Sequence, residues 1–220
     1  WLQQQMAAST ATWQVLGQQV LMGRMNIPAP ILMETIQPGS GVTVSQYAAL
    51  VARARTNPAS LTPAEQAILA QPSIPYNLDA WDGYQAARET VLATSRSLGK
   101  NLVVLSGDTH NAWANELQDR NGNAVGVEFA TSSVTSPGFE EYLPNENPAT
   151  LAGALQQLIA PLKYCDTSRR GYMVLTATAS ECRADWVYVN TITSRNYTAS
   201  TDKSLKVVAG ATGVGRIVAA

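Results

Sequence analysis

The sequence has one histidine, two cysteines and few charged residues, and each shortage narrows the class of protein. Charged side chains make up 14% of the 220 residues, and the formal net charge is −1. Proteins that bind nucleic acid or a membrane surface normally carry a basic stripe or block, so we expect no nucleic-acid partner. No apolar run approaches the roughly 18 residues that a spanning helix needs, so we expect no transmembrane segment.

The two cysteines do not indicate a redox compartment. Cys165 precedes a predicted hairpin and Cys182 lies near its turn, which would separate them by roughly 20–30 Å at about 3.3 Å per residue. A disulfide cannot span that distance, so we expect two free thiols. The chain opens on Trp1 without a signal-peptide pattern, and we expect its native N-terminus to lie upstream.

The composition is typical of a globular protein, and helix and strand patterns alternate along the sequence. Hydrophobic residues make up 45% of the chain, which is long enough for one sizeable core. After an initial helical pattern, an apolar run over 14–23 predicts a strand, and the Pro/Gly-rich segment 27–41 predicts a loop. Helical spacing predicts a helix over 44–56, and Thr62 with Glu65 forms a capping box that starts another.

The clearest helical pattern covers 81–101 and leads into a buried strand. Gly99 is placed as the residue that follows a helix end. The segment 101–106, NLVVLS, is almost continuously apolar, as in strands that are buried on both faces. Helix, short loop and buried strand in this order predict an α/β unit.

The second half of the chain is rich in strand patterns. An Asn-Gly pair between two alternating runs predicts a β-hairpin. The fold class is therefore mixed α/β, with helices and strands in the first half and mostly strands in the second. Strands are expected at 112–118, 124–133, 170–179, 183–192 and 203–210, with one helix near 148–160.

The buried strand runs directly into Asp108 and His110. Ligand sites of open α/β sheets lie at the carboxyl ends of such strands, and Gly107 allows a sharp turn there. A carboxylate and an imidazole separated by one residue can bind one cation, such as zinc, iron, manganese or calcium. The alternative is that the histidine caps a turn or hydrogen-bonds a carboxylate. Two ligands do not hold a metal, since a catalytic site usually needs about three or four.

Several blocks of the sequence resemble one family. The segment SGDTHNAW, residues 106–113, resembles the last metal motif, S-G-D-x-H-x-x-W, of the PhoD-like alkaline phosphatases, which belong to the calcineurin-like metallophosphoesterase superfamily. The other blocks occur in the family's order: TWQVLGQQVLM, NLDAWDGYQAARE, VEFATSSVTSPG and RRGYMVLTATASECRADWVYV. The family's earlier metal motifs have no counterpart, so residues 1–220 resemble the C-terminal portion of a single PhoD-like domain.

The resemblance implies a metal-dependent hydrolase of phosphate mono- and diesters that is periplasmic or secreted. It implies half of a β-sandwich that is flanked by helices and ends in β-hairpins. Iron and calcium are the implied metals, with zinc or manganese also open. Asp108 and His110 would be metal ligands, and no acid–base catalytic residue is assigned. The implied partners are the phosphate ester and the N-terminal half of the same polypeptide, without which the fragment should be inactive.

Other polar residues are weaker candidates. Arg88 and Asn111 are predicted to bind substrate phosphate. Arg169 and Arg170 fit either a phosphate clamp, because guanidinium groups match phosphate oxygens, or a turn-stabilising salt bridge. Glu128 is expected to support a ligand rather than to be one. The alternative function is a non-catalytic phosphate- or metal-binding module on the same fold.

Overall fold

The protein's structure is a computed structural model that describes residues 1–213 and 215–220. The first half contains α1 (Leu2–Ala8), β1 (Trp13–Gly17), β2 (Asn26–Pro28), α2 (Ala29–Ile36), α3 (Val44–Thr56), η1 (Pro58–Ser60), α4 (Pro63–Leu69), β3 (Ser73–Pro75), η2 (Trp81–Gly83), α5 (Gln85–Ser97) and β4 (Asn101–Ser106). The second half contains β5 (Ala112–Gln118), β6 (Ala124–Ala130), α6 (Phe139–Tyr142), α7 (Pro148–Leu158), β7 (Leu162–Asp166), β8 (Gly171–Ala177), β9 (Glu181–Val189), β10 (Ala199–Val208) and β11 (Val218–Ala219). No helix among the described residues is both long and apolar enough to cross a membrane.

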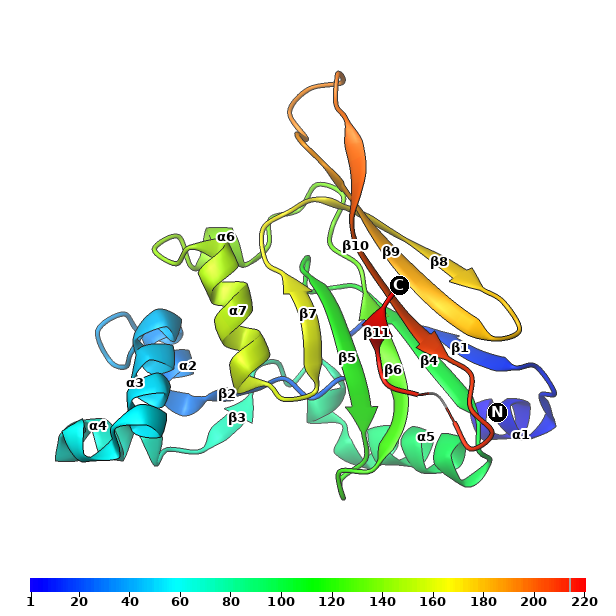
Figure 1. The fold of residues 1–220 in the computed structure, drawn as a ribbon, viewed down its shortest axis with the longest axis horizontal. Helices are drawn as coiled ribbons and strands as arrows, with labels where there is room; N and C mark the ends of the chain where they lie inside the picture. Colours follow the sequence, from blue (N-terminus) through cyan, green and yellow to red (C-terminus); the bar gives the residue numbers. More distant parts are fainter. Residues whose placement is uncertain (214) are drawn as a thin grey trace.

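Two β-sheets pack against each other and form a sandwich (Figure 1). The first has the strand order β1-β4-β6-β5-β7, and the second has the order β11-β10-β9-β8. Val103 and Phe129 of the first sheet pack against Val207 and Trp186 of the second. The Trp186 indole also donates a 2.9 Å hydrogen bond to the Ala130 carbonyl, which ties the sheets together. The predicted mixed α/β class and the sandwich are confirmed.

The other face of the first sheet is covered by α5. Leu92 of this helix packs with Leu102 and Val104 of β4. Because Val103 faces the opposite sheet, β4 is buried on both faces, as its apolar sequence predicts. Gly99 has φ 61° just beyond α5, so the predicted helix end is confirmed.

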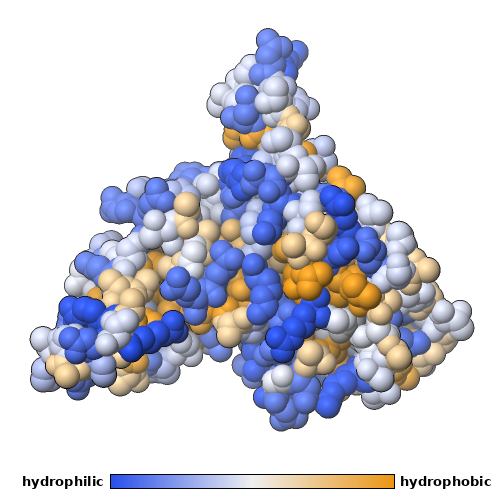
Figure 2. Space-filling view, viewed as in Figure 1, coloured by the Kyte–Doolittle hydropathy of each residue, from blue (hydrophilic) through white to orange (hydrophobic). Residues whose placement is uncertain are grey.

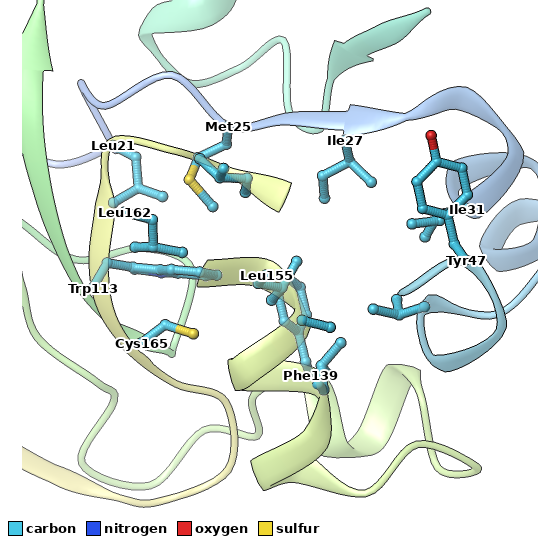
Figure 3. Packing of buried hydrophobic residues seen from close by; sticks show 14 of the residues in the cluster. Leu21, Met25, Ile27, Ile31, Tyr47, Trp113, Phe139, Leu155, Leu162 and Cys165 are labelled. Atoms are coloured by element: carbon cyan, nitrogen blue, oxygen red, sulfur yellow. The ribbon is translucent and has the colours of Figure 1, made fainter. Parts of the chain in front are cut away.

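A lobe of helices lies beyond β7, at the left of Figure 1, and comprises α2, α3, α4, α6 and α7 with the β2–β3 pair. Its hydrophobic cluster continues into the first sheet, because Trp113 of β5 and Cys165 of β7 belong to it (Figure 3). Figure 2 shows a largely hydrophilic or neutral outer surface on this face of the lobe, so its apolar side chains are mostly turned inward. Both cysteines are free thiols, as predicted.

Two predicted segments differ most from the structure, while the helix expected over 81–101 is shortened to α5 and strand β7 was not predicted. The strand expected over 14–23 ends at Gly17, because the backbone N–H groups of Met22 and Gly23 donate to the Glu128 carboxylate and not to a neighbouring strand. The loop expected over 27–41 contains α2. Pro30 stands in the first turn of α2, where proline starts a helix and does not break it.

Candidate metal centre

Residues 107–111 form a short loop at the carboxyl end of β4. Asp108 has φ 68° and His110 has φ 61°, and they are the only non-glycine residues with positive φ in the part of the chain that the structure describes. This left-handed conformation costs a non-glycine residue about 1–3 kcal/mol, and such strain concentrates at functional sites. The two predicted metal ligands therefore share a strained backbone that the rest of the fold must hold in place.

Hydrogen bonds to the other residues hold this loop. The Gly107 N–H donates to the Gln19 carbonyl at 3.0 Å, and the Trp113 indole donates to the Thr109 hydroxyl at 2.7 Å. Asn111 receives a 3.0 Å hydrogen bond from the Phe139 N–H through its side-chain oxygen and donates to the Thr109 carbonyl at 2.6 Å. These contacts leave the side chains of Asp108 and His110 free of the loop's own hydrogen bonding.

The ring of His110 is oriented by a backbone carbonyl. Its Nδ1 lies 2.9 Å from the Pro137 oxygen, and because a carbonyl only accepts, Nδ1 carries the proton. The Nε2 atom then keeps its lone pair, as a metal-ligating histidine requires. The residue after Pro137, Gly138, permits the close approach of Asn111, since a Cβ there would lie 2.4 Å from the Asn111 side-chain oxygen.

The carboxylate of Asp108 is exposed and accepts no hydrogen bond from the residues that the structure describes. Its charge is felt by the neighbouring Tyr76. Burial is the main cause that raises the pKa of Tyr76, and the charges of Tyr142 and Asp108 add to that rise. An aspartate carboxylate without hydrogen-bond partners among the described residues, beside a half-buried phenol, is available to bind a cation through its oxygens.

Asp108 and His110 line one cavity of about 290 Å³. Tyr76 and Asn77 line the same cavity, although nothing in their local sequence pattern indicates it. They reach it because β2 pairs with β3 and the Tyr76 N–H donates to the Met25 carbonyl at 2.9 Å. A pairing between segments about 50 residues apart carries no short-range signal.

The donor set of this cavity fits a metal ion in part. A free carboxylate and an imidazole with an available Nε2 suit iron, zinc, manganese or calcium. Among residues 1–213 and 215–220, no group of three or more His, Cys, Asp or Glu side chains is placed to hold a metal ion.

The structure does not bring Arg88 to the cavity. Its side chain is 1% exposed, and its guanidinium donates to the carbonyls of Met22 at 2.7 Å and Gln118 at 3.1 Å. It also pairs with Glu89 at 2.9 Å. Its two hydrogen bonds to carbonyl oxygens join α5 to the loop after β1 and to the end of β5, which is a structural role.

The side chain of Asn111 is fully buried, and both ends of its amide are engaged within the protein, by the Thr109 carbonyl and the Phe139 N–H. It does not line the cavity. The structure thus places this residue behind the loop, where it orients the loop and does not face the space that a phosphate would occupy.

Glu128 has no exposed surface, and its carboxylate accepts hydrogen bonds from several segments near residues 107–111. Its carboxylate accepts hydrogen bonds from the N–H groups of Met22 at 2.6 Å and Gly23 at 2.9 Å. It also accepts from the Ser106 hydroxyl and the Asn115 amide, each at 3.0 Å. Burial raises the pKa of this carboxyl, while the four donated bonds act in the opposite direction. Among the described residues, Glu128 hydrogen-bonds to neither Asp108 nor His110 and reaches the strand before them through Ser106, so its role in supporting a ligand stays a prediction.

Neither candidate clamp arginine lines the cavity. Arg169 forms salt bridges with Asp166 at 2.6 Å and Asp202 at 2.7 Å. Arg170 forms a salt bridge with Glu140. Of the two readings that the sequence allowed, the structure shows the salt bridges.

The chain is similar to known proteins in sequence and in fold. A family model for PhoD-like phosphatases matches residues 1–186, and the chain belongs to that family. It is similar to alkaline phosphatase D of Bacillus subtilis (strain 168), with 25% identity over 224 residues that cover 99% of this chain and 30% of the relative. It is also similar to a solved structure of PhoD, with a TM-score of 0.65 and 23% identity, over 100% of this chain and 34% of that one. At that identity the structural likeness shows the fold alone, and the chain spans about a third of the length of these relatives.

Proposed function

We propose that this chain is the C-terminal part of a metal-dependent phosphatase that hydrolyses phosphate mono- and diesters. The observation that carries the proposal is the shared cavity of Asp108 and His110, with Nδ1 of the imidazole held by Pro137 and Nε2 available. Membership of the PhoD-like phosphatase family supports the reaction class.

In this proposal Asp108 supplies a carboxylate oxygen and His110 supplies Nε2 to a cation. The family resemblance favours iron and calcium, and zinc or manganese also suit these donors. Because two protein ligands do not hold a catalytic metal, the remaining donors come from the N-terminal half of the same polypeptide. A bound cation supplies Lewis-acid stabilisation of the charge on the phosphoryl group.

The chain's own residues position and shield this site. The hydrogen bonds to Thr109 and Asn111 keep the loop in its left-handed conformation before substrate arrives. Such pre-positioning is worth several kcal/mol in catalysis, since no reorganisation is needed during the reaction. Apolar side chains from the lobe line the rest of the cavity and limit the access of water.

The proposal also includes an export location, periplasmic or secreted, and inactivity of the isolated 220-residue chain. Cell fractionation of the native organism tests the location. A membrane-free cytosolic pool holding all of the protein would contradict it. The activity of residues 1–220 purified alone, compared with that of the intact gene product, tests the dependence on upstream sequence.

The central experiment measures hydrolysis of p-nitrophenyl phosphate and bis(p-nitrophenyl) phosphate by the intact gene product at alkaline pH. Elemental analysis of the same preparation gives its metal content. We expect activity that a chelator removes and that Asp108→Ala and His110→Ala abolish together with bound metal. Activity that survives both the chelator and these substitutions would contradict the metal-ligand roles. Metal binding without any ester hydrolysis would favour the non-catalytic module.

A further inference from the structure

The cavity at Asp108 and His110 is mostly apolar. Leu151 and Leu155 lie one turn apart on α7 and line one wall, and Ile27, Ile31 and Val44 line another. Figure 3 shows Ile27 and Leu155 directed into the same interior of the lobe. A site that had only to hold a phosphate group and cations would not need walls made of aliphatic side chains.

Several polar groups of the cavity lie close to the candidate metal ligands. Asp108 and His110 belong to one loop, and the charge of Asp108 reaches Tyr76, which directly precedes Asn77. Of the described residues that line the cavity, Asp108 alone has a formal charge at neutral pH. On α2, the Thr35 hydroxyl donates to the Ile31 carbonyl at 3.0 Å and is therefore already engaged. The cavity thus has polar groups at the candidate metal ligands and is otherwise mostly apolar.

The volume of the cavity sets the size of the group that it can hold. Its 290 Å³ lie at the lower end of the range for small-molecule sites. At about 30 Å³ for each water-sized group, that space accommodates on the order of ten heavy atoms. An inorganic phosphate with five heavy atoms would leave much of it unfilled.

We propose that the apolar part of this cavity binds the organic group of the substrate, and that the preferred esters are alkyl or aryl phosphates whose apolar group has on the order of five or six carbons, since the phosphate itself takes about half of the space. This inference rests on the proposed function, because it places the phosphoryl group at Asp108 and His110. Helices α2, α3, α6 and α7 of the lobe then determine substrate preference, while the loop after β4 serves the reaction.

The first test measures phosphate release by the intact gene product from ethyl, butyl, hexyl, octyl and dodecyl phosphate. The alcohols of this series are nearly equal as leaving groups, so differences in kcat/KM report binding of the chain. We expect kcat/KM to rise by about twofold to fourfold for each added methylene up to the capacity of the cavity, and then to level off or fall. Equal kcat/KM across the series, in a protein that does hydrolyse these esters, would overturn the inference and leave the proposed function intact.

Substitutions on α2 locate the effect. Leu32 lines the cavity, whereas its neighbour Met33 is 48% exposed and does not. Leu32→Trp fills the space, and we expect the octyl-to-ethyl ratio of kcat/KM to fall at least tenfold, while Leu32→Ala shifts the preferred length upward. Met33→Trp is the matched control and should leave the ratio unchanged. Because the unsubstituted protein already gives the chain-length series, the test does not depend on the folding of a variant.

A binding measurement separates this inference from the proposed reaction. Octylphosphonate and ethylphosphonate carry similar anionic head groups and are not hydrolysed. We expect octylphosphonate to bind the intact gene product at least tenfold more tightly by calorimetry, with Leu32→Trp removing the difference. If no ester is hydrolysed but this preference is found, the apolar site stands and the proposed reaction fails. Equal affinity for both phosphonates would overturn the apolar site whatever the activity.

Discussion

Strand β5 has a short loop at each end, and both loops contain an aspartate and left-handed backbone. In the turn after β5, Asp119 accepts hydrogen bonds from the N–H groups of Asn121 and Asn123, each at 2.9 Å. The positive φ of that turn, 80°, falls on Gly122. In the loop before β5, the positive φ values fall on Asp108 and His110, and the Asp108 carboxylate has no hydrogen bond among the described residues.

The difference separates a loop whose aspartate is hydrogen-bonded within its own turn from a loop whose aspartate carboxylate has no hydrogen bond among the described residues. The Asp119 carboxylate accepts hydrogen bonds within its own turn and forms a salt bridge with Arg96 at 3.2 Å. Glycine takes the unfavourable conformation there at little steric cost. At the other end of β5 the strain is carried by the two residues that we propose as metal ligands. Hydrogen bonds to the Asp108 carboxylate would stabilise the loop before β5, but they would also occupy the oxygens that are now free of hydrogen bonds among the described residues.

The largest expected effect is on activity, in a comparison of substitutions at Asp108 and Asp119. Asp108→Asn removes one anionic donor and keeps the shape, and asparagine tolerates positive φ as well as aspartate does. We expect kcat/KM of the intact gene product for p-nitrophenyl phosphate to fall at least about 100-fold, with an unchanged melting temperature. Asp119→Asn is the control and should retain activity. Equal activity losses in both variants would remove the functional distinction between the loops.

The next effect concerns the two glycines behind the loops. A Cβ at Gly138 would meet the Asn111 side-chain oxygen at 2.4 Å, whereas a Cβ at Gly122 would meet nothing within 4 Å. We therefore expect Gly138→Ala to cost about 2–3 kcal/mol of unfolding free energy and to lower metal content. Gly122→Ala should cost about 1–2 kcal/mol through its positive φ alone and leave the metal content unchanged. Denaturant unfolding and elemental analysis measure both quantities.

A third prediction uses the pH dependence of the turn after β5. Burial alone would raise the pKa of Asp119, but hydrogen bonds from Asn123 and Asn121 and the charge of Arg96 outweigh it, so the pKa lies below its usual range. A carboxyl whose pKa is lower in the folded state stabilises the protein above its unfolded pKa, and the gain disappears as pH falls through the folded value. We expect Asp119→Ala to cost about 1–2 kcal/mol at pH 7 and progressively less below about pH 4. A cost that stays constant down to pH 2 would contradict the ionised hydrogen-bonded turn.

The smallest effect has the opposite sign. Asp108→Gly replaces a strained residue by one that adopts φ 68° freely. We expect a gain of about 0.5–1 kcal/mol in unfolding free energy together with loss of activity, because the larger freedom of glycine in the unfolded chain offsets part of the relieved strain. Thermal unfolding of the variant measures the gain. A clear loss of stability would show that Asp108 is held by contacts that favour the folded state.

The features that the sequence predicted well are those with local causes. The buried strand before Asp108, the Asn-Gly hairpin and the capping box at Thr62 each depend on residues within a few positions of one another. The segment over 14–23 was assigned too long a strand because its backbone donors are satisfied by Glu128, more than 100 residues away.

The candidate site was predictable only where one loop contains it. Asp108 and His110 are neighbours in sequence, so their shared cavity followed from a single pattern. Tyr76 reaches the same cavity because β2 pairs with β3. The local sequence around Tyr76 does not predict this pairing, since the two strands lie far apart in the chain. Arg88 was predicted to bind substrate because it lies in the NLDAWDGYQAARE block at the start of the long helix, but its guanidinium donates to backbone carbonyls inside the protein.

Trp113 belongs at once to the hydrogen bonds of the loop and to the hydrophobic cluster of the lobe. Its indole N–H holds Thr109, and its ring meets that of Phe139, a residue of the cavity wall, edge to face at 5.9 Å. A change in the packing of the lobe, caused by heat or by substitution, is therefore expected to shift the loop through the Trp113 side chain. Substitutions in the cavity wall and in the loop after β4 should therefore affect each other through Trp113.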